Sequence, residues 1–368
     1  MNTLKAVWIL NNVPNFGIQR FKEIQNKVSD FNLFDTVQFE DVCHQLHWDP
    51  NYAVQFEQIK QAGNFERAHE RCTQQGIHLI SILDREYPKN LLTIYDPPLI
   101  LYIKGNLIPE DELAIAIVGS RNASLYGLKI CGQFASQLAE KGITIVSGFA
   151  RGIDGEAHRS SLRAKGRTIA VLGCGLDVIY PKEHVSLYEK ISENGAVISE
   201  FSLGTPPQAF NFPMRNRIIS GLSKGILVVE ASRRSGSLIT SSSAAEQGRE
   251  VYVIPGPIDQ YSSQGTNELI QKGAKLVVSV EDILEDLAPQ LKASLRELGC
   301  QDSEDKSETK DTKVDDPLLQ LLQKKPLSLD EIIASSNEKP HQIQIKLTHL
   351  ELKGSVKRQF GGRYILVN

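Results

Sequence analysis

Seven short apolar runs, separated by segments long enough for helices, constrain the fold of this chain more than any other feature. They are residues 114–118, 143–146, 169–172, 196–198, 226–229, 251–254 and 276–280. Runs that are apolar on both faces are typical of strands buried on both sides, and the connections have the length of crossover helices. The pattern predicts an α/β fold with a mostly parallel sheet covered by helices on both faces. Right-handed crossovers would gather the loops that follow the strands along one edge.

The sequence before these runs predicts a separate small domain. Residues 1–75 have a helical pattern in which the turn residues Pro14 and Gly17 precede an apolar stripe, so we expect a helical domain of the SAM or helix-hairpin-helix type. Residues 80–290 would form the α/β domain, entered through a proline-punctuated segment with a short strand at 100–103.

The sequence after the runs predicts two further parts. Residues 291–316 contain the polar, mostly acidic stretch QDSEDKSETKDTKVDD and predict a flexible linker. Residues 317–368 predict a winged-helix domain with three helices, the second opened by a capping box of Ser328 and Glu331, and a hairpin around Gly361 and Gly362. Its excess of cations leaves DNA contact and protein docking equally open.

Charge and cysteine content exclude several classes of protein. The 368-residue chain has a formal net charge of −3, so a site for a polyanion must be a local concentration of Arg and Lys. Five cysteines without a CxxC pair indicate reduced thiols, and no apolar segment approaches the roughly 20 residues that span a bilayer. We expect a cytoplasmic protein with no membrane segment. Cys43, His44, His47, His69 and Cys72 lack the tight spacing of a zinc knuckle, so no metal site is predicted.

The loops after the predicted strands place small residues beside cations. They include Gly119, Ser120 and Arg121; Gly148, Arg151 and Gly152; Lys182; and Arg233, Arg234, Ser235, Gly236 and Ser237. Glycines let the backbone approach a ligand, helix starts favour negative charge, and arginine can bind phosphate through two N–H groups. Together these loops predict a groove that holds several phosphates, with Phe149 or Phe212 available to stack a base.

Other chemistries fit the sequence less well. The run GCGLDV at 173–178 lacks the third glycine of a dinucleotide fingerprint, and no GxxxxGK[ST] motif is present, so no nicotinamide or other cofactor is expected. Cys174 has no base beside it in sequence and is expected to pack. Asp154 and His158 could form a catalytic pair, but an acid at a helix start with a histidine one turn later is the commoner arrangement. No catalytic residue is assigned.

The stretches AIAIVGSRNAS, SGFARGIDGEAH, FPMRNRIISGLS and VVEASRRSGSLIT, in this order, closely resemble the DNA-processing protein A family (DprA, also called Smf). The resemblance covers about residues 87–287 and implies an extended Rossmann-like domain that binds single-stranded DNA, forms a homodimer and loads RecA recombinase during natural transformation. By the same resemblance, the phosphate-contacting cations are Arg121, Arg151, Lys182, Arg215 and Arg217. The remaining lining is Ser120, Gly148, Gly152, Asn216, Ser235, Gly236, Ser237 and Thr240.

The predicted function is therefore sequence-independent binding of single-stranded DNA, without enzymatic activity. The alternative is an enzyme resembling the nucleotide phosphoribohydrolases of the same superfamily. Those carry a PGGxGTxxE signature, whereas the corresponding segment here, residues 235–240, has neither the double glycine nor the Glu. A third possibility is a protein adaptor whose groove has no ligand.

Overall fold

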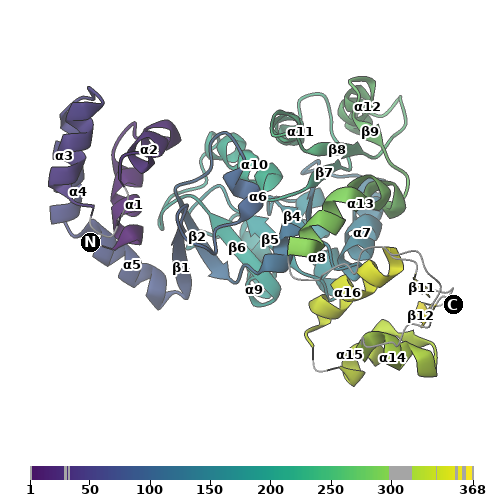
Figure 1. The fold of residues 1–368 in the computed structure, drawn as a ribbon. Coiled ribbons are helices and arrows are strands. Elements are labelled where there is room, and N and C mark those ends of the chain that lie inside the picture. Colours follow the sequence, from purple (N-terminus) through teal and green to yellow (C-terminus); the bar gives the residue numbers. More distant parts are fainter. Residues whose placement is uncertain are drawn as a thin grey trace.

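A nine-stranded sheet organises the computed structural model, in the order β1-β2-β6-β5-β4-β3-β7-β8-β9 (Figure 1). The structure describes residues 2–28, 31, 34–297, 317–336, 338–352, 355–358 and 362–366. The strands of the sheet are β1 Ile77–Ser81, β2 Ile100–Gly105, β3 Ala114–Val118, β4 Thr144–Ser147, β5 Thr168–Val171, β6 Gly195–Ser199, β7 Gly225–Val228, β8 Glu250–Val253 and β9 Lys275–Leu276.

The strands from β6 to β9 in that order are parallel, which confirms the predicted fold class. The edge formed by β1 and β2 is antiparallel, with Leu79 opposite Tyr102 and Tyr102 opposite Ser199. The sequence pattern did not predict β1, whose five residues follow the last N-terminal helix with little separation. At the other edge, β9 has only two residues because Asp282 accepts hydrogen bonds from the N–H groups of Val278 and Ser279 and starts a helix there.

Helices cover both faces of the sheet, as alternating side chains of the strands require. Ile115 and Ile117 pack in one apolar cluster with helices α7, α8 and α13, whereas Ala116 and Val118 pack in the other with α6 and α10. The helices of this region are α6 Lys89–Leu92, α7 Leu125–Glu140, α8 Ile153–Arg163, α9 Val185–Asn194, α10 Asn211–Gly221, α11 Gly236–Glu246, α12 Gln264–Gln271 and α13 Val280–Glu297, with 3-10 turns η1 Pro109–Glu112, η2 Lys182–His184 and η3 Tyr261–Ser263.

The N-terminal helices lie beside β1 and β2 (Figure 1). They are α1 Thr3–Asn12, α2 Ile18–Gln25, α3 Thr36–Gln45, α4 Asn51–Gln61 and α5 Asn64–Gln74, packed around an aromatic cluster that includes Phe34, Phe39 and Phe56. The indole Nε1–H of Trp8 donates to the hydroxyl of Tyr102 at 3.0 Å, which joins α1 to the sheet. Among the described residues, no group of His, Cys, Asp or Glu side chains is arranged to hold a metal ion.

The C-terminal part contains α14 Pro317–Lys324, α15 Leu329–Ser335, α16 Pro340–Leu352, β10 Leu327–Ser328, β11 Val356–Arg358 and β12 Arg363–Leu366. The capping box of Ser328 and Glu331 is present at the start of α15, as predicted. Helix α13 continues to Glu297, so the first residues of the predicted linker are helical, and residues 298–316 and Gly361 lie outside the described part of the chain.

Helix α16 packs against the turn between α7 and β4. The Thr348 hydroxyl donates to the carbonyl oxygen of Lys141 at 2.6 Å, and Arg358 lies 3.2 Å from the carboxylate of Glu140. Ile345 joins the apolar cluster of α7 and α8, over Gly142. This contact lies at the amino end of β4, opposite the loops that follow the strands.

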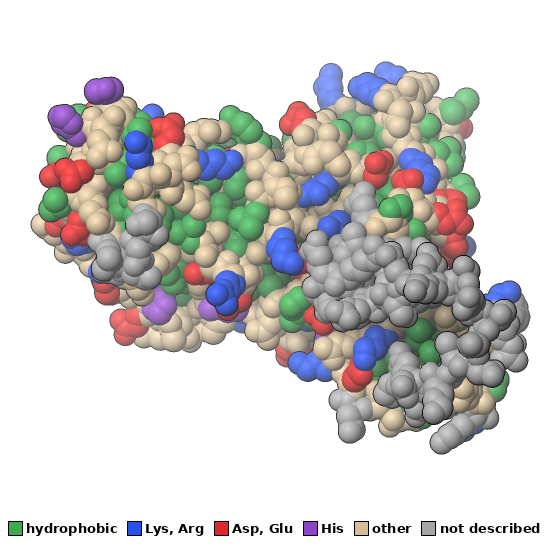
Figure 2. Space-filling view, viewed as in Figure 1, with side chains coloured by type: hydrophobic (Ala, Val, Ile, Leu, Met, Phe, Trp, Pro, Cys, Tyr) green, Lys and Arg blue, Asp and Glu red, His purple; other side chains and the backbone are tan. Residues whose placement is uncertain are grey.

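One face of the molecule is mixed in charge. On the face drawn in Figure 2, the coloured Lys and Arg side chains are interspersed with Asp and Glu side chains. In the parts of the chain that the structure describes, no helix has the length and apolar character needed to cross a membrane.

Candidate nucleic-acid interface

Two adjoining cavities open at the carboxyl ends of β3, β4, β5 and β7, with volumes of about 180 and 650 Å³. They share the lining residues Arg121, Asn122, Ala150, Tyr180 and Phe212. We call the surface formed by all residues lining the two cavities the strand-end groove. In the strand order, β3 lies between β4 and β7, so the chain builds the sheet outward from β3 first on one side and later on the other. Ligands of parallel α/β sheets bind at the carboxyl ends of the strands where the strand order reverses in this way.

Most of the predicted site residues line this groove. They are Ser120, Arg121, Gly148, Arg151, Phe212, Arg215, Asn216, Ser235, Gly236, Ser237 and Thr240. Gly152 does not line a cavity, but it has a φ of +71°, and a Cβ there would lie 2.2 Å from the carbonyl oxygen of Ser120. Gly152 therefore lets the start of α8 cross close to the loop after β3.

Arg121 is an exposed cation of the groove. It forms no ion pair with any carboxylate that the structure describes, and its guanidinium carbon lies 5.1 Å from the centre of the Phe212 ring. The Phe212 ring lies 6.0 Å from that of Tyr180, so a cation and two aromatic rings stand together at the junction of the cavities. A cation above a ring that also faces solvent can bind a phosphate while the ring contacts a base.

The start of a helix also lines the larger cavity. Helix α11 begins there, with Ser235 as its N-cap, and its hydroxyl accepts a hydrogen bond from the N–H of Ser237. Ser237 and Thr240 are buried at the lining, whereas Gly236 is exposed. The start of a helix favours negative charge, so this wall complements the cation of Arg121.

Arg215 lies beneath the groove and is only 4% exposed. Its Nη1 donates to the carbonyl oxygens of Gly148, at 2.7 Å, and Val171, and its Nε donates to Asn216 at 3.2 Å. Burial lowers the pKa of Arg215 to about 10, so the side chain stays charged at neutral pH. Two of its three guanidinium nitrogens are thus bonded within the protein, and they join α10 to the ends of β4 and β5.

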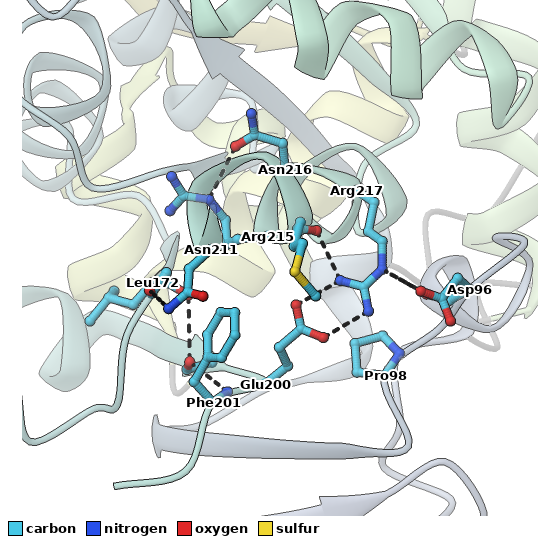
Figure 3. A network of polar contacts seen from close by, with 12 residues as sticks. Asp96, Pro98, Leu172, Glu200, Phe201, Asn211, Arg215, Asn216 and Arg217 are labelled. Atoms are coloured by element: carbon cyan, nitrogen blue, oxygen red, sulfur yellow. Dashed lines mark hydrogen bonds and ion pairs between the residues drawn. The ribbon is translucent and has the colours of Figure 1, made fainter. Parts of the chain in front are cut away.

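Arg217 does not reach the groove, which corrects its predicted role as a phosphate contact. Its Nη1 and Nη2 each donate to Glu200 at 2.7 Å, and its Nε donates to Asp96 at 3.1 Å (Figure 3). The cause is its position in α10, because residues two apart on a helix point to different sides. Arg215 therefore turns under the groove, and Arg217 turns to the loop that precedes β2.

Phe149 and Lys182 also lie away from the cavities. Phe149 is 1% exposed and packs against His158, His184 and Tyr188, so it cannot stack a base in this arrangement. Its φ of +60° turns the side chain into the core. Lys182 is exposed on η2 and does not line either cavity. Of the two aromatic residues proposed for base stacking, only Phe212 is available.

Arg151 lines the smaller cavity but forms an ion pair with Glu183. Both side chains are largely exposed, and such a pair contributes little to stability. A phosphate could therefore replace the carboxylate of Glu183 without a large loss of folding free energy.

The polar residues considered for catalysis have structural contacts. The Nδ1 of His158 lies 2.6 Å from the Thr168 hydroxyl, and the ring is buried, which lowers its pKa to about 3. Asp154 accepts from the N–H of Ala150 at 3.3 Å, and its pKa is raised by burial. The Cys174 thiol donates to Val178, and burial raises its pKa to about 11. Asp154 is the only carboxylate in the described lining of either cavity.

Sequence reasoning missed several lining residues. Tyr180 and Ile239 are both 45% exposed at the groove, and Glu230 is buried beside it. The Glu230 carboxylate accepts from the N–H of Ser124 at 3.1 Å and so fixes the start of α7. Tyr180 could have been found, because it shares a strand-end loop with Lys182, and sites for single-stranded nucleic acid combine cations with aromatic side chains that stack on bases.

Comparisons with known proteins agree with this architecture. A family model described as DNA recombination-mediator protein A matches residues 78–288, and one described as DprA winged helix domain matches residues 302–362. Protein Smf of Escherichia coli is 51% identical over 215 residues, which are 58% of this chain and 58% of that protein.

Two solved structures share the fold. DNA processing protein A from Streptococcus pneumoniae has a TM-score of 0.68 and 39% identity, over 77% of this chain and 98% of that one. DNA processing protein A from Helicobacter pylori, described for its single-stranded DNA binding mode, has a TM-score of 0.53 and 30% identity. This match covers 58% of this chain and 96% of that one. The first family model alone covers more than half of the 368 residues. The chain therefore belongs to the DNA recombination-mediator protein A family, the family also named DprA or Smf.

Proposed function

We propose that this protein binds single-stranded DNA along the strand-end groove, without reading its sequence, and loads RecA recombinase onto the bound strand during natural transformation and recombination. The observation that carries the proposal is Arg121. It is an exposed guanidinium with no ion pair to a carboxylate in the described chain, it lies over Phe212, and it lines the same cavity as the start of α11. Phosphates would contact the arginine and the helix start, and bases would stack on Phe212 and Tyr180.

A salt titration tests the groove. Fluorescence anisotropy of a labelled single-stranded oligonucleotide of mixed sequence is measured between 50 and 200 mM salt. Arg121→Ala is expected to weaken binding and to lower the slope of log K against log salt by about 0.7, the value for one phosphate on a single strand. The ratio of the wild-type binding constant to that of the variant would then fall by about 2.6-fold between 50 and 200 mM salt.

The control is Arg85→Ala. Arg85 is also an exposed arginine, but it lies at the cavity beside η1, at the other end of the strands. The Arg85→Ala variant should have the wild-type affinity for DNA and the wild-type salt slope. Equal effects of the two variants, or an unchanged slope for Arg121→Ala, would contradict the proposed groove.

RecA loading is the finer part of the proposal and needs its own assay. RecA ATPase activity is measured on single-stranded DNA coated with single-strand-binding protein, with and without this protein. The wild-type protein is expected to shorten the lag before RecA becomes active, and Arg121→Ala to shorten it less. An unchanged lag with wild-type protein that binds DNA normally would reject RecA loading and leave DNA binding standing.

We also propose a homodimer formed through the Rossmann-like domain. The open edge of the sheet at β9 exposes Leu276 and Val278, at 46% and 72%, and Ile258 and Tyr261 are exposed beside η3 at 90% and 63%. Exposed apolar side chains on a sheet edge favour association with a second copy. Light scattering after gel filtration should give twice the chain mass for wild type and the single chain mass for Val278→Asp. A monomeric wild-type protein would contradict the proposal.

A further inference from the structure

The two loops that wall the strand-end groove are tied to each other. The first loop, residues 172–181, follows β5 and contributes Gly173, Cys174, Tyr180 and Pro181 to the smaller cavity. The second loop, residues 200–210, follows β6 and contributes Pro207 and Ala209 to the larger one. Asp177 of the first loop accepts from the N–H of Gly204 in the second at 2.7 Å, and the N–H of Gly175 donates to the carbonyl oxygen of Thr205 at 3.0 Å.

The N-terminal helical domain reaches the first loop directly and the second loop through Tyr102 of β2. Arg71 of α5 lies 3.5 Å from the other carboxylate oxygen of Asp177. Trp8 of α1 donates to the Tyr102 hydroxyl, which in turn donates to the hydroxyl of Ser202 in the second loop at 3.3 Å. Two different N-terminal helices are therefore linked to the groove loops at Asp177 and Ser202, which line neither cavity.

The second loop has few other attachments near its middle. Its far end is held by Asn211, whose side chain donates to Gly173 at 3.0 Å and Pro206 at 3.3 Å. Its near end is held by Arg217 at Glu200 and by the contacts given above at Ser202 and Gly204. Gly204 itself is exposed and has a φ of +84°. The position of Pro207 and Ala209 at the groove thus depends on both ends being fixed.

We propose that the N-terminal helical domain is a brace for the groove, in which Arg71 and Trp8 are positioning residues for single-stranded DNA binding. The domain acts through Asp177 and Ser202 and does not itself contact the single-stranded DNA. This inference rests on the proposed function of the groove. It assigns the domain a role that is mechanical and that changes the affinity of the groove without changing the number of phosphates it holds.

The test compares Arg71→Gln with Arg67→Gln. Both arginines are exposed on α5, but Arg67 donates to the carbonyl oxygen of Ala62 at the end of α4 and to Asn64 at the start of α5. Arg71→Gln is expected to weaken binding of a single-stranded oligonucleotide by up to about fivefold, the range for a partly exposed ion pair. The salt slope should stay unchanged, and Arg71→Lys should restore affinity. Arg67→Gln should match wild type.

A double-mutant cycle shows whether Arg71 acts through Asp177. Asp177→Asn keeps an oxygen acceptor for the N–H of Gly204 and removes only the charge. The double variant Arg71→Gln with Asp177→Asn should bind no more weakly than either single variant, because both remove the same contact. Additive losses, a slope lowered by about 0.7 in Arg71→Gln, or equal losses in Arg67→Gln would overturn the brace.

A readout without DNA separates this inference from the proposed function. Phe210 is 64% exposed at the end of the second loop and is a site for chymotrypsin. The initial rate of cleavage after Phe210 should rise in Arg71→Gln and stay at the wild-type value in Arg67→Gln. If wild-type protein does not bind DNA but the cleavage rates differ in this way, the proposed function fails and the brace stands. Equal cleavage rates would overturn the brace whatever the DNA result.

Discussion

Replacement of Arg215 by Met should destabilise the fold without removing a phosphate contact. Arg215 is 4% exposed, and its removal leaves the carbonyl oxygens of Gly148 and Val171 without this donor and the buried Asp154 without the cation that lowers its pKa most. Breaking one partner of a buried charge network costs about 3–5 kcal/mol. Because burial already raises the pKa of Asp154, that group can take up a proton, and the lower figure of about 3 kcal/mol is expected.

The assay is thermal unfolding followed by circular dichroism, with Arg121→Met as the matched control. A loss of about 3 kcal/mol corresponds to a fall in Tm of about 6–12 °C for a domain of this size. The exposed Arg121 should change Tm by no more than about 2 °C. In a DNA salt titration at a temperature where both variants are folded, only Arg121→Met should lower the slope. If Arg215→Met kept the wild-type Tm and lowered the slope by about 0.7, then its guanidinium binds phosphate and the structural role is refuted.

Three further predictions follow from other buried contacts. Arg217→Ala removes the two hydrogen bonds to Glu200 and should cost about 1.5–3 kcal/mol in urea denaturation, with the salt slope of DNA binding unchanged. His158 is neutral in the folded protein because burial lowers its pKa to about 3, whereas the unfolded chain binds a proton below about pH 6.5. Stability should therefore fall as pH drops below about 6.5, and His158→Asn should lose less stability than wild type between pH 7 and 5, as urea midpoints will show. Gly142→Ala would place a Cβ 2.7 Å from Cγ1 of Ile345 and should speed hydrogen exchange in α16, and unchanged exchange would argue against the packing of α16 on this turn.

The strands were predictable because burial on both faces leaves a continuous apolar run, which is a strong signal even in four residues. Residues 114–118 match β3 at both ends. Strand β1 gave a weaker signal, since only the pairing with β2 at the sheet edge distinguishes it from the end of the preceding helical region. The capping box at Ser328 was predictable for a local reason, because both of its hydrogen bonds lie within four residues.

The residue types of the groove were predictable, but the directions of their side chains were not. Arg215 and Arg217 were both expected at the groove because the resemblance to the family implied phosphate contacts at both positions, and a sequence alone does not show which way each side chain points. In the structure, α10 begins at Asn211, and Pro213 lies in its first turn, where proline is tolerated. The helical phase then separates the two arginines. Phe149 was misplaced because nothing local in the sequence predicts a positive φ at a phenylalanine.

Helix α7 connects the strand-end groove with the C-terminal domain. Its first turn is held by Glu230 beside the cavities, and the carbonyl of Lys141, at its C-cap, receives the hydroxyl of Thr348 from the C-terminal domain. Sixteen helical residues make a rod of about 24 Å between these two anchorages. The strand-end groove and the contact of α16 are therefore anchored at opposite ends of one helix.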